Sequence, residues 1–242
     1  MAASIGLLLC YGSFLFVLDE AQAFTLTRED GPYEVISAVF FLMTALLLLA
    51  TFMRNNKRTR RMTFGNAVYL CLGLLFLFGF FEEISWGQRL FGIATPEYLQ
   101  EANRQGEINI HNLSVFHARD AEGNRKSGLA LLLIAERLFS LFWLIFCCLV
   151  PFAFKVHKPT RRLLKRLQFP IVPLSLGGLF AVNYVLSKVI TPHLILRLQD
   201  PLVEVKECGF ACLFLVMGLW FLTHDTAAAT THTVHIPSAQ HD

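Results

Sequence analysis

The chain is poor in charged residues. Of its 242 residues, 16% are Asp, Glu, Lys or Arg and 55% are hydrophobic, and the mean hydropathy is +0.51. Soluble globular chains are usually about 25% charged and about 45–50% apolar. The composition therefore favours lipid as the main solvent, and the 23 Phe residues agree with this. A formal net charge of only +3 gives no indication of a nucleic-acid partner.

None of the six cysteines lies in a long polar loop, so no disulfide framework is expected. All six fall within apolar runs, where cysteine usually behaves as a small hydrophobic side chain. Cys208 and Cys212 share a helix face at a spacing of four residues. That spacing suits a metal or redox pair as well as plain packing, and packing is the favoured interpretation.

Six apolar runs are candidates for crossing a bilayer, which takes about 17–25 helical residues. They cover residues 3–18, 33–53, 66–82, 129–154, 171–190 and 203–222. The first is short and has no basic segment before it, so a retained helix is favoured over a signal peptide, although Ala21-Gln22-Ala23 resembles a cleavage site. The sequence predicts an all-α, polytopic bundle of about six helices over residues 1–222, followed by a disordered tail over 223–242.

Asp and Glu are missing from the two short loops that are richest in basic residues. Residues 54–65 include five Lys or Arg and residues 155–170 include six, together more than half of the chain's 21. Short basic loops stay on the cytoplasmic side of a membrane. The sequence therefore predicts a membrane protein with cytoplasmic N- and C-termini, and nearly all of its acidic residues are expected at the outer face.

The segment from Phe80 to Leu113 combines acidic, aromatic and amide side chains at the end of an apolar run. Glu82 and Glu83 are expected at or just below the outer headgroups, where ionisable groups are costly unless they are paired or hydrated. Trp86 suits the interfacial aromatic belt. Arg89 is close enough in the chain to balance one of the glutamates.

The loop of residues 82–128 is expected to fold over the outer end of the bundle. A Thr-Pro-Glu start, with the threonine as N-cap and the proline at the first position, predicts a short surface helix over about 96–104. Residues 107–111 then alternate polar and apolar, which in an extended chain places every second side chain on one face. The residues on the polar face are Glu107, Asn109 and His111.

Further polar residues enter other apolar runs at the same level. Glu34 begins the second run, and Glu204 and Glu207 share a face at the start of the last. Counted from Gly128 at about 1.5 Å per residue, Glu136 is expected roughly 12 Å into the membrane, facing the bundle interior. These groups are predicted to converge on one pocket below the outer surface.

The candidate site residues divide by role. The catalytic candidates are Glu82, Glu83, Arg89, Glu107 and His111; the candidate metal ligands are Glu34, Glu83, His111, Glu204 and Glu207; the candidate binding residues are Trp86, Gln88, Asn109, Asn112, Glu136 and Arg137. Carboxylates with histidine suit a divalent metal cofactor or general acid–base catalysis. A network of Glu, Arg, Asn and Gln that only ties the loop to the helix ends explains the same residues equally well.

Two motifs carry a resemblance to a family of bacterial multi-pass membrane proteins that brings no established activity with it. They are Glu-Glu-x-Ser-Trp-Gly-Gln-Arg at 82–89 and Gly-Glu-x-Asn-x-His-Asn-Leu at 106–113, joined by a Glu-Asp-Gly-x-x-Glu start at 29–34. That start also resembles, more distantly, the alkaline ceramidase and progestin-receptor-like hydrolases, which hold a buried zinc with histidines. Their paired histidines in a late helix are missing here, where Glu204 and Glu207 stand instead.

Three classes of function fit these observations. The first is a metal-assisted hydrolase or transferase that acts on a lipid-linked substrate at the outer leaflet. The second is a non-catalytic subunit or assembly factor of a larger membrane complex. An ion-coupled transporter is least favoured, because no internal repeat is visible and the inner halves of the helices carry almost no ionisable residue. Membrane lipids and other membrane subunits are the expected partners.

Overall fold

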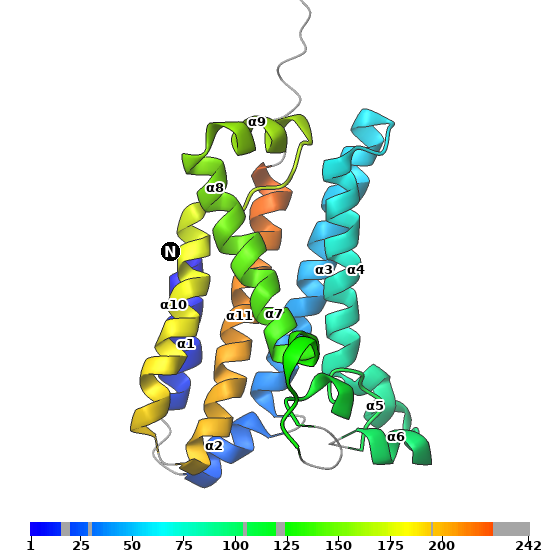
Figure 1. Cartoon of the computed structure of the whole chain (residues 1–242), viewed down its shortest axis with the longest axis vertical. Helices are drawn as coiled ribbons and strands as arrows, with labels where there is room; N and C mark the ends of the chain where they lie inside the picture. The colour runs from blue at the N-terminus through cyan, green and yellow to red at the C-terminus, as the bar shows by residue number, and fades with distance from the viewer. Residues whose placement is uncertain (16–19, 29–30, 104–105, 120–123, 195, 225–242) are drawn as a thin grey trace, which may run out of the picture.

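The protein is a bundle of long helices, shown in Figure 1 by a computed structural model that describes residues 1–15, 20–28, 31–103, 106–119, 124–194 and 196–224. Helices make up all the regular structure of these residues. The bundle helices are α1 (Ala2–Leu15), α3 (Pro32–Thr59), α4 (Phe64–Glu83), α7 (Ala135–Trp143), η4 (Leu144–Leu149), α8 (Val150–Val156), α10 (Leu174–Ile190) and α11 (Leu196–His224). The short elements are α2 (Glu20–Thr27), η1 (Ser85–Gly87), α5 (Gln88–Phe91), α6 (Glu97–Ala102), η2 (Ser114–Phe116), η3 (Gly128–Leu133), α9 (Lys158–Arg166) and η5 (Thr191–His193).

Five helical segments are long and apolar enough to cross a membrane, so the chain is a multi-pass membrane protein. They are Ala21–Thr59, Phe64–Glu83, Ala135–Val156, Leu174–His193 and Pro201–His224. The predicted helix over 3–18 is present as α1, whose apolar part, Ala3–Leu15, is shorter than these five. It packs along α11 and α10. The predicted tail begins within α11, and the rest of it, 225–242, lies outside the described residues.

Helix α11 forms the centre of the bundle, and phenylalanine rings pack around it. The side chain of Phe214 is fully buried. Its ring centroid lies 4.8 Å from that of Phe76 on α4, 4.9 Å from that of Phe180 on α10 and 5.8 Å from that of Phe142 on α7. Aromatic pairs at such separations stabilise a core beyond the area that they bury. Much of the phenylalanine therefore lies inside the bundle as well as on its surface.

The prediction of one continuous helix over 129–154 is wrong at its start. Gly128 has a positive φ of 59°, residues 128–133 form a 3₁₀ segment, and Ile134 is extended before α7 begins at Ala135. An apolar composition does not distinguish a 3₁₀ segment from an α-helix. The predicted depth of Glu136 is wrong for the same reason: the residue lies in the first turn of α7, and its side chain is 63% exposed.

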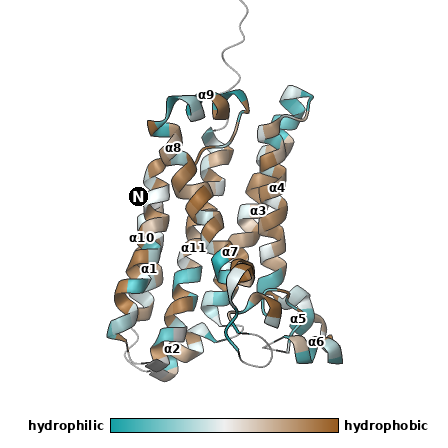
Figure 2. Ribbon diagram, viewed as in Figure 1, coloured by the Kyte–Doolittle hydropathy of each residue, from teal (hydrophilic) through white to brown (hydrophobic). Residues whose placement is uncertain are grey.

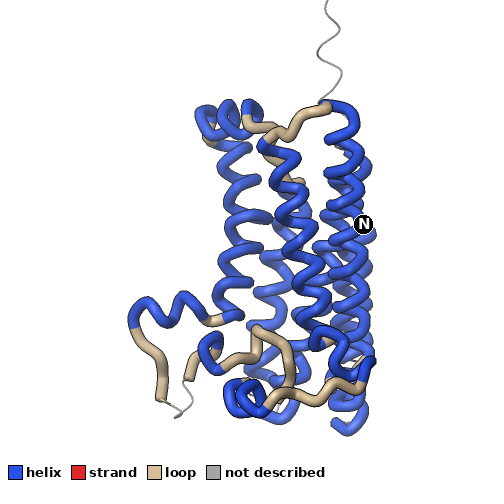
Figure 3. Tube along the Cα trace, turned by 90° about the vertical axis from the view of Figure 1, so that its right-hand side faces the viewer, coloured by secondary structure: helices blue, strands red, loops and turns tan. Residues whose placement is uncertain are grey.

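The two ends of the bundle differ in chemistry and structure. Hydrophobic residues dominate the middle of the long helices and hydrophilic residues gather at both ends (Figure 2). Helix α9 lies across one end, which includes the basic loops. The loop between α4 and α7 covers the other end, and part of it projects sideways from the bundle (Figure 3). The candidate site residues lie at that second end, which we call the acidic end.

Candidate functional site

Helix α4 is followed, after Ile84, by three consecutive residues with positive φ angles. The φ angles are 45° for Ser85, 55° for Trp86 and 76° for Gly87. Glycine adopts this conformation without strain, but non-glycine residues pay about 1–2 kcal/mol each. Such a conformation persists only where the surrounding contacts determine it. The turn buries Ser85 and stacks Trp86 on Phe81, with ring centroids 5.3 Å apart.

Glu82 is a buried carboxylate that joins α4 to the loop. Its Oε1 accepts a hydrogen bond from Trp86 Nε1 at 2.6 Å. Its Oε2 accepts from the backbone N–H groups of Ile110 and His111, both at 2.8 Å, and contacts His111 Nδ1 at 3.0 Å. A buried carboxylate with four donors is well satisfied. Glu82 therefore fixes the position of residues 110 and 111.

Glu107 forms a second buried junction. Its Oε2 accepts hydrogen bonds from the hydroxyl of Ser85 and, at 3.0 Å, from Asn109 Nδ2. Its Oε1 lies 3.4 Å from Arg89 Nη1. Asn103 Nδ2 donates to Asn109 Oδ1 at 2.8 Å and so holds that amide in place. The inward placement of Glu107 and Asn109 follows the alternation seen in the sequence.

Gln88 and Arg89 connect the turn to two other segments. Gln88 Oε1 accepts from the backbone N–H of Ile108 at 2.8 Å, and its Nε2 donates to Thr95 Oγ1 at 2.5 Å. Arg89 Nη2 lies 3.3 Å from Glu34 Oε1 on α3. The arginine thus sits between a carboxylate of α3 and Glu107. These contacts tie the loop to the helix ends.

The predicted surface helix is shorter than expected and begins one residue later. Helix α6 covers Glu97–Ala102, with Pro96 rather than Thr95 at the N-cap. The hydroxyl of Thr95 instead accepts the hydrogen bond of Gln88. The Thr-Pro-Glu sequence that predicted the helix start could not show that Gln88, seven positions earlier, would bind the threonine hydroxyl.

His111 is the one predicted catalytic residue at this end that exposes a large part of its side chain, 45%. Because the carboxylate of Glu82 accepts at Nδ1, that nitrogen carries a proton, and Nε2 is the free nitrogen of the neutral ring. Within the described residues, no hydrogen bond or ion pair engages Nε2.

Glu83 lies within electrostatic range of a group of carboxylates. It interacts electrostatically with residues of α3, α4 and α11, namely Glu34, Glu82, Glu204 and Glu207. In the part of the chain that the structure describes, its carboxylate has no hydrogen-bond or ion-pair partner. The structure therefore separates two neighbouring glutamates: Glu82 is saturated with donors, and Glu83 is not.

Lys206 lies beside these carboxylates and was missed in the sequence. Its side chain is 7% exposed, and Nζ lies 3.6 Å from Glu136 Oε1 and 4.0 Å from Glu207 Oε1. Its backbone carbonyl accepts a hydrogen bond from the buried Asn183 at 2.9 Å. A signal was present, because Lys206 is the single basic residue of the run 203–222. A lone lysine in an apolar span is costly without a partner.

Two predicted binding residues remain to be placed. Arg137 is exposed on α7, and Asn112 is half-buried in the loop. Among the described residues, no group of three or more His, Cys, Asp or Glu side chains is arranged to hold a metal ion. Two of the candidate ligands already have other partners, since Glu34 contacts Arg89 and His111 contacts Glu82.

Comparisons with protein-family models, with curated proteins and with solved structures find no match to this chain. The resemblances of its motifs therefore remain expectations. The geometry of the acidic end is the basis for any assignment of function.

Proposed function

We propose that the protein is a membrane-embedded hydrolase or transferase that acts on a lipid-linked substrate at the acidic end. The observation that carries the proposal is the pair formed by Glu82 and His111. A buried carboxylate holds Nδ1 at 3.0 Å, while 45% of the histidine side chain stays exposed. This is the arrangement in which a carboxylate orients a histidine for proton transfer through its other nitrogen.

In the proposed reaction, His111 acts as the general base. Its Nε2 takes a proton from water or from a substrate hydroxyl as the oxygen attacks an acyl or phosphoryl centre. Glu82 stabilises the resulting imidazolium and keeps the ring oriented. The proton then passes to the leaving-group oxygen, so His111 returns to its neutral state.

Glu83 is proposed as a second proton-transfer group. Its carboxylate lacks a hydrogen-bond partner among the described residues and lies within electrostatic range of carboxylates of α3 and α11. Lys206 supplies a positive charge in the same region through its contacts with Glu136 and Glu207.

The position of the site supports a lipid-linked substrate. The segments Phe64–Glu83 and Pro201–His224, which contribute Glu83 and Glu207, are both candidate membrane spans. Beside the site, Leu90 and Phe91 of α5 expose 75% and 77% of their surface. Apolar side chains at a membrane interface suit contact with acyl chains. A substrate anchored in the bilayer would approach the site from this side.

The proposal does not assign ligands for a metal. A divalent ion would polarise the scissile group and activate water if one bound here. The described carboxylates form no group of three arranged for a metal, so the roles proposed above rest on proton transfer alone.

The proposal is tested by lipid conversion in vesicles. Purified full-length protein is reconstituted with a bacterial membrane lipid extract, and consumed and formed lipids are followed by mass spectrometry. We expect a conversion by the wild type that falls at least about 100-fold in His111→Gln, the range expected for loss of a general base. Lys158→Gln, exposed at the opposite end, is the control and should convert lipids like the wild type. Equal conversion by His111→Gln would contradict the assignment.

A second candidate is a subunit or assembly factor, and the exposed apolar side chains of the loop favour it. Tyr98 on α6 is 70% exposed, and Leu90 and Phe91 on α5 are 75% and 77% exposed. Large exposed apolar groups mark contact surfaces for lipid or protein. Under this candidate, Leu90→Ser with Phe91→Ser would release a stoichiometric partner that the wild type retains during purification from native membranes. Retention of the partner by the double variant would argue against it.

A further inference from the structure

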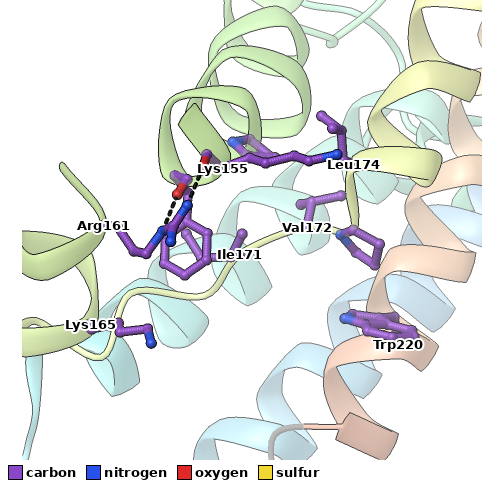
Figure 4. A pocket seen from close by; sticks show the side chains of 10 residues that line it. Lys155, Arg161, Lys165, Ile171, Val172, Leu174 and Trp220 are labelled. Carbon is purple, nitrogen blue, oxygen red and sulfur yellow. Dashed lines mark hydrogen bonds between the residues drawn. The ribbon is translucent and has the colours of Figure 1, made fainter. Parts of the chain in front are cut away.

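A cavity lies at the basic end of the bundle, opposite the acidic end, between α8, α9, α11 and the segment that leads into α10. Its volume is about 430 Å³, which is within the usual range for sites that bind small molecules. Three basic side chains line it, those of Lys155, Arg161 and Lys165 (Figure 4). We call it the basic cavity.

The two lysines of the basic cavity are available to a ligand. Both side chains are exposed, and within the described residues neither ammonium group has a hydrogen bond or ion pair. The loop of residues 155–170 contains no Asp or Glu that would compete for them. The cavity therefore carries positive charge that its own neighbours in this loop do not neutralise.

Arg161 has a different part in the cavity. Its Nε donates to the carbonyl of Phe154 at 2.8 Å, and its Nη2 donates to the carbonyl of Lys155. These are carbonyls of the last turn of α8, which form the negative end of the helix dipole. Arg161 covers that negative end and keeps further N–H donors of its guanidinium for an anion.

The start of α10 adds to the positive potential. Leu174, its first residue, and Pro173 before it both line the cavity. No side chain caps this helix start, and its first turn has no acidic residue. Unbonded N–H groups and the positive end of a helix dipole favour a negatively charged ligand. This effect reinforces the lysines and does not carry the inference alone.

The other walls of the cavity are apolar, and they lie where two candidate spans end. Phe154, Val172 and Trp220 line it, and the spans that finish here are Ala135–Val156 and Pro201–His224. The segment before α10 is held closely, since a Cβ placed on Gly65 of α4 would collide with the backbone of Gln168. Apolar walls do not stabilise a bound inorganic anion, whereas an acyl chain packs against them and removes them from water.

We infer that the basic cavity binds the phosphate group of an anionic membrane lipid. Lys155 and Lys165 contact the phosphate, Arg161 stands behind it, and the first part of an acyl chain lies against Phe154 and Trp220. The lipid would brace α9 against the ends of α8 and α11. The inference is independent of the chemistry proposed at the acidic end.

The inference is tested by native mass spectrometry of the full-length protein in detergent, titrated with phosphatidylglycerol. The double variant Lys155→Gln with Lys165→Gln should retain this lipid about twenty-five-fold more weakly, because each lysine near an anionic headgroup contributes roughly fivefold. The matched control is Lys57→Gln with Arg58→Gln, which removes the same charge from exposed positions near the end of α3. The control should retain phosphatidylglycerol like the wild type.

Two further measurements distinguish a lipid phosphate from free inorganic phosphate as the ligand. The zwitterionic lipid phosphatidylcholine should bind the wild type and the cavity variant equally weakly, and millimolar inorganic phosphate should not displace phosphatidylglycerol. Displacement by inorganic phosphate would overturn the lipid in favour of a soluble anion. Equal loss of phosphatidylglycerol in the cavity variant and the control, or no loss in either, would overturn the cavity as the site. The replaced lysines are exposed, and unchanged thermal unfolding of each variant verifies that it is folded.

Discussion

Glu82 and His111 are 29 positions apart in the chain, yet Glu82 Oε2 lies 3.0 Å from His111 Nδ1. The same oxygen accepts the backbone N–H groups of residues 110 and 111, so the imidazole and its backbone are held by one atom. The end of α4 and this part of the loop consequently form one rigid unit. A catalytic histidine requires such positioning, and so would a purely structural junction.

Replacing Glu82 with Gln should destabilise the protein. The amide removes the charge from the bonds to Ile110 and His111, and one of its ends turns a donor toward other donors. Loss of charge-assisted bonds at a buried group costs about 2–3 kcal/mol. We expect the free energy of unfolding in detergent to fall by about this amount. Glu97→Gln, exposed on α6, is the control and should change it little; an equal effect of both would contradict the role of Glu82.

Glu83→Gln should have the opposite effect on stability. It replaces a carboxyl group that lies within electrostatic range of four other carboxylates, and it breaks no hydrogen bond found in the described residues. We expect the free energy of unfolding to stay unchanged or to rise by about 1 kcal/mol, while lipid conversion falls at least about 100-fold. Thermal unfolding and the vesicle assay measure the two effects. A strongly destabilised Glu83→Gln variant would assign Glu83 to the structural network.

The ion pairs of Lys206 can be tested by a double-mutant cycle. Lys206→Met preserves much of the apolar volume but leaves the carboxylate of Glu207, whose side chain is 43% exposed, without its cation, which should cost up to about 1 kcal/mol of unfolding free energy. Adding Glu207→Gln should recover at least half of that loss, because the unpaired charge is then gone. Additive effects of the two substitutions would show that the residues do not interact.

The strained turn offers a matched comparison at Ser85. Ser85→Ala and Ser85→Gly both remove the hydroxyl that donates to Glu107, but only glycine relieves the positive φ of 45°. The glycine variant should therefore unfold with a free energy about 1 kcal/mol higher than that of the alanine variant. Equal stability of the two variants would mean that the turn is not strained in the protein.

Much of the bundle was predictable because the apolar runs are long and separated by polar loops. The run 66–82 corresponds to α4, Phe64–Glu83, and the alternation of 107–111 anticipated the burial of Glu107 and Asn109. The first signal is the length of an apolar run and the second is a period of two, and both can be recognised in the local sequence alone.

What the sequence did not provide depends on contacts between distant segments. Composition alone could not show that Gly128 takes a positive φ, so the start of α7 and the depth of Glu136 were predicted wrongly. Lys206 was overlooked because its partner Glu136 comes from another helix, 70 positions earlier in the chain. The different environments of Glu82 and Glu83 likewise arise from the loop and from α11, which neighbouring positions in a sequence cannot distinguish.

The central position of α11 bears on how the protein is made. It is the last of the described helices to leave the ribosome, yet α1, α3 and α10 all pack against it. The helices that enter the bilayer earlier therefore keep their inner faces exposed to lipid until α11 packs against them. Lys206 and Glu207 lie on this last described helix, so a nascent chain holds no complete acidic end until α11 has been synthesised.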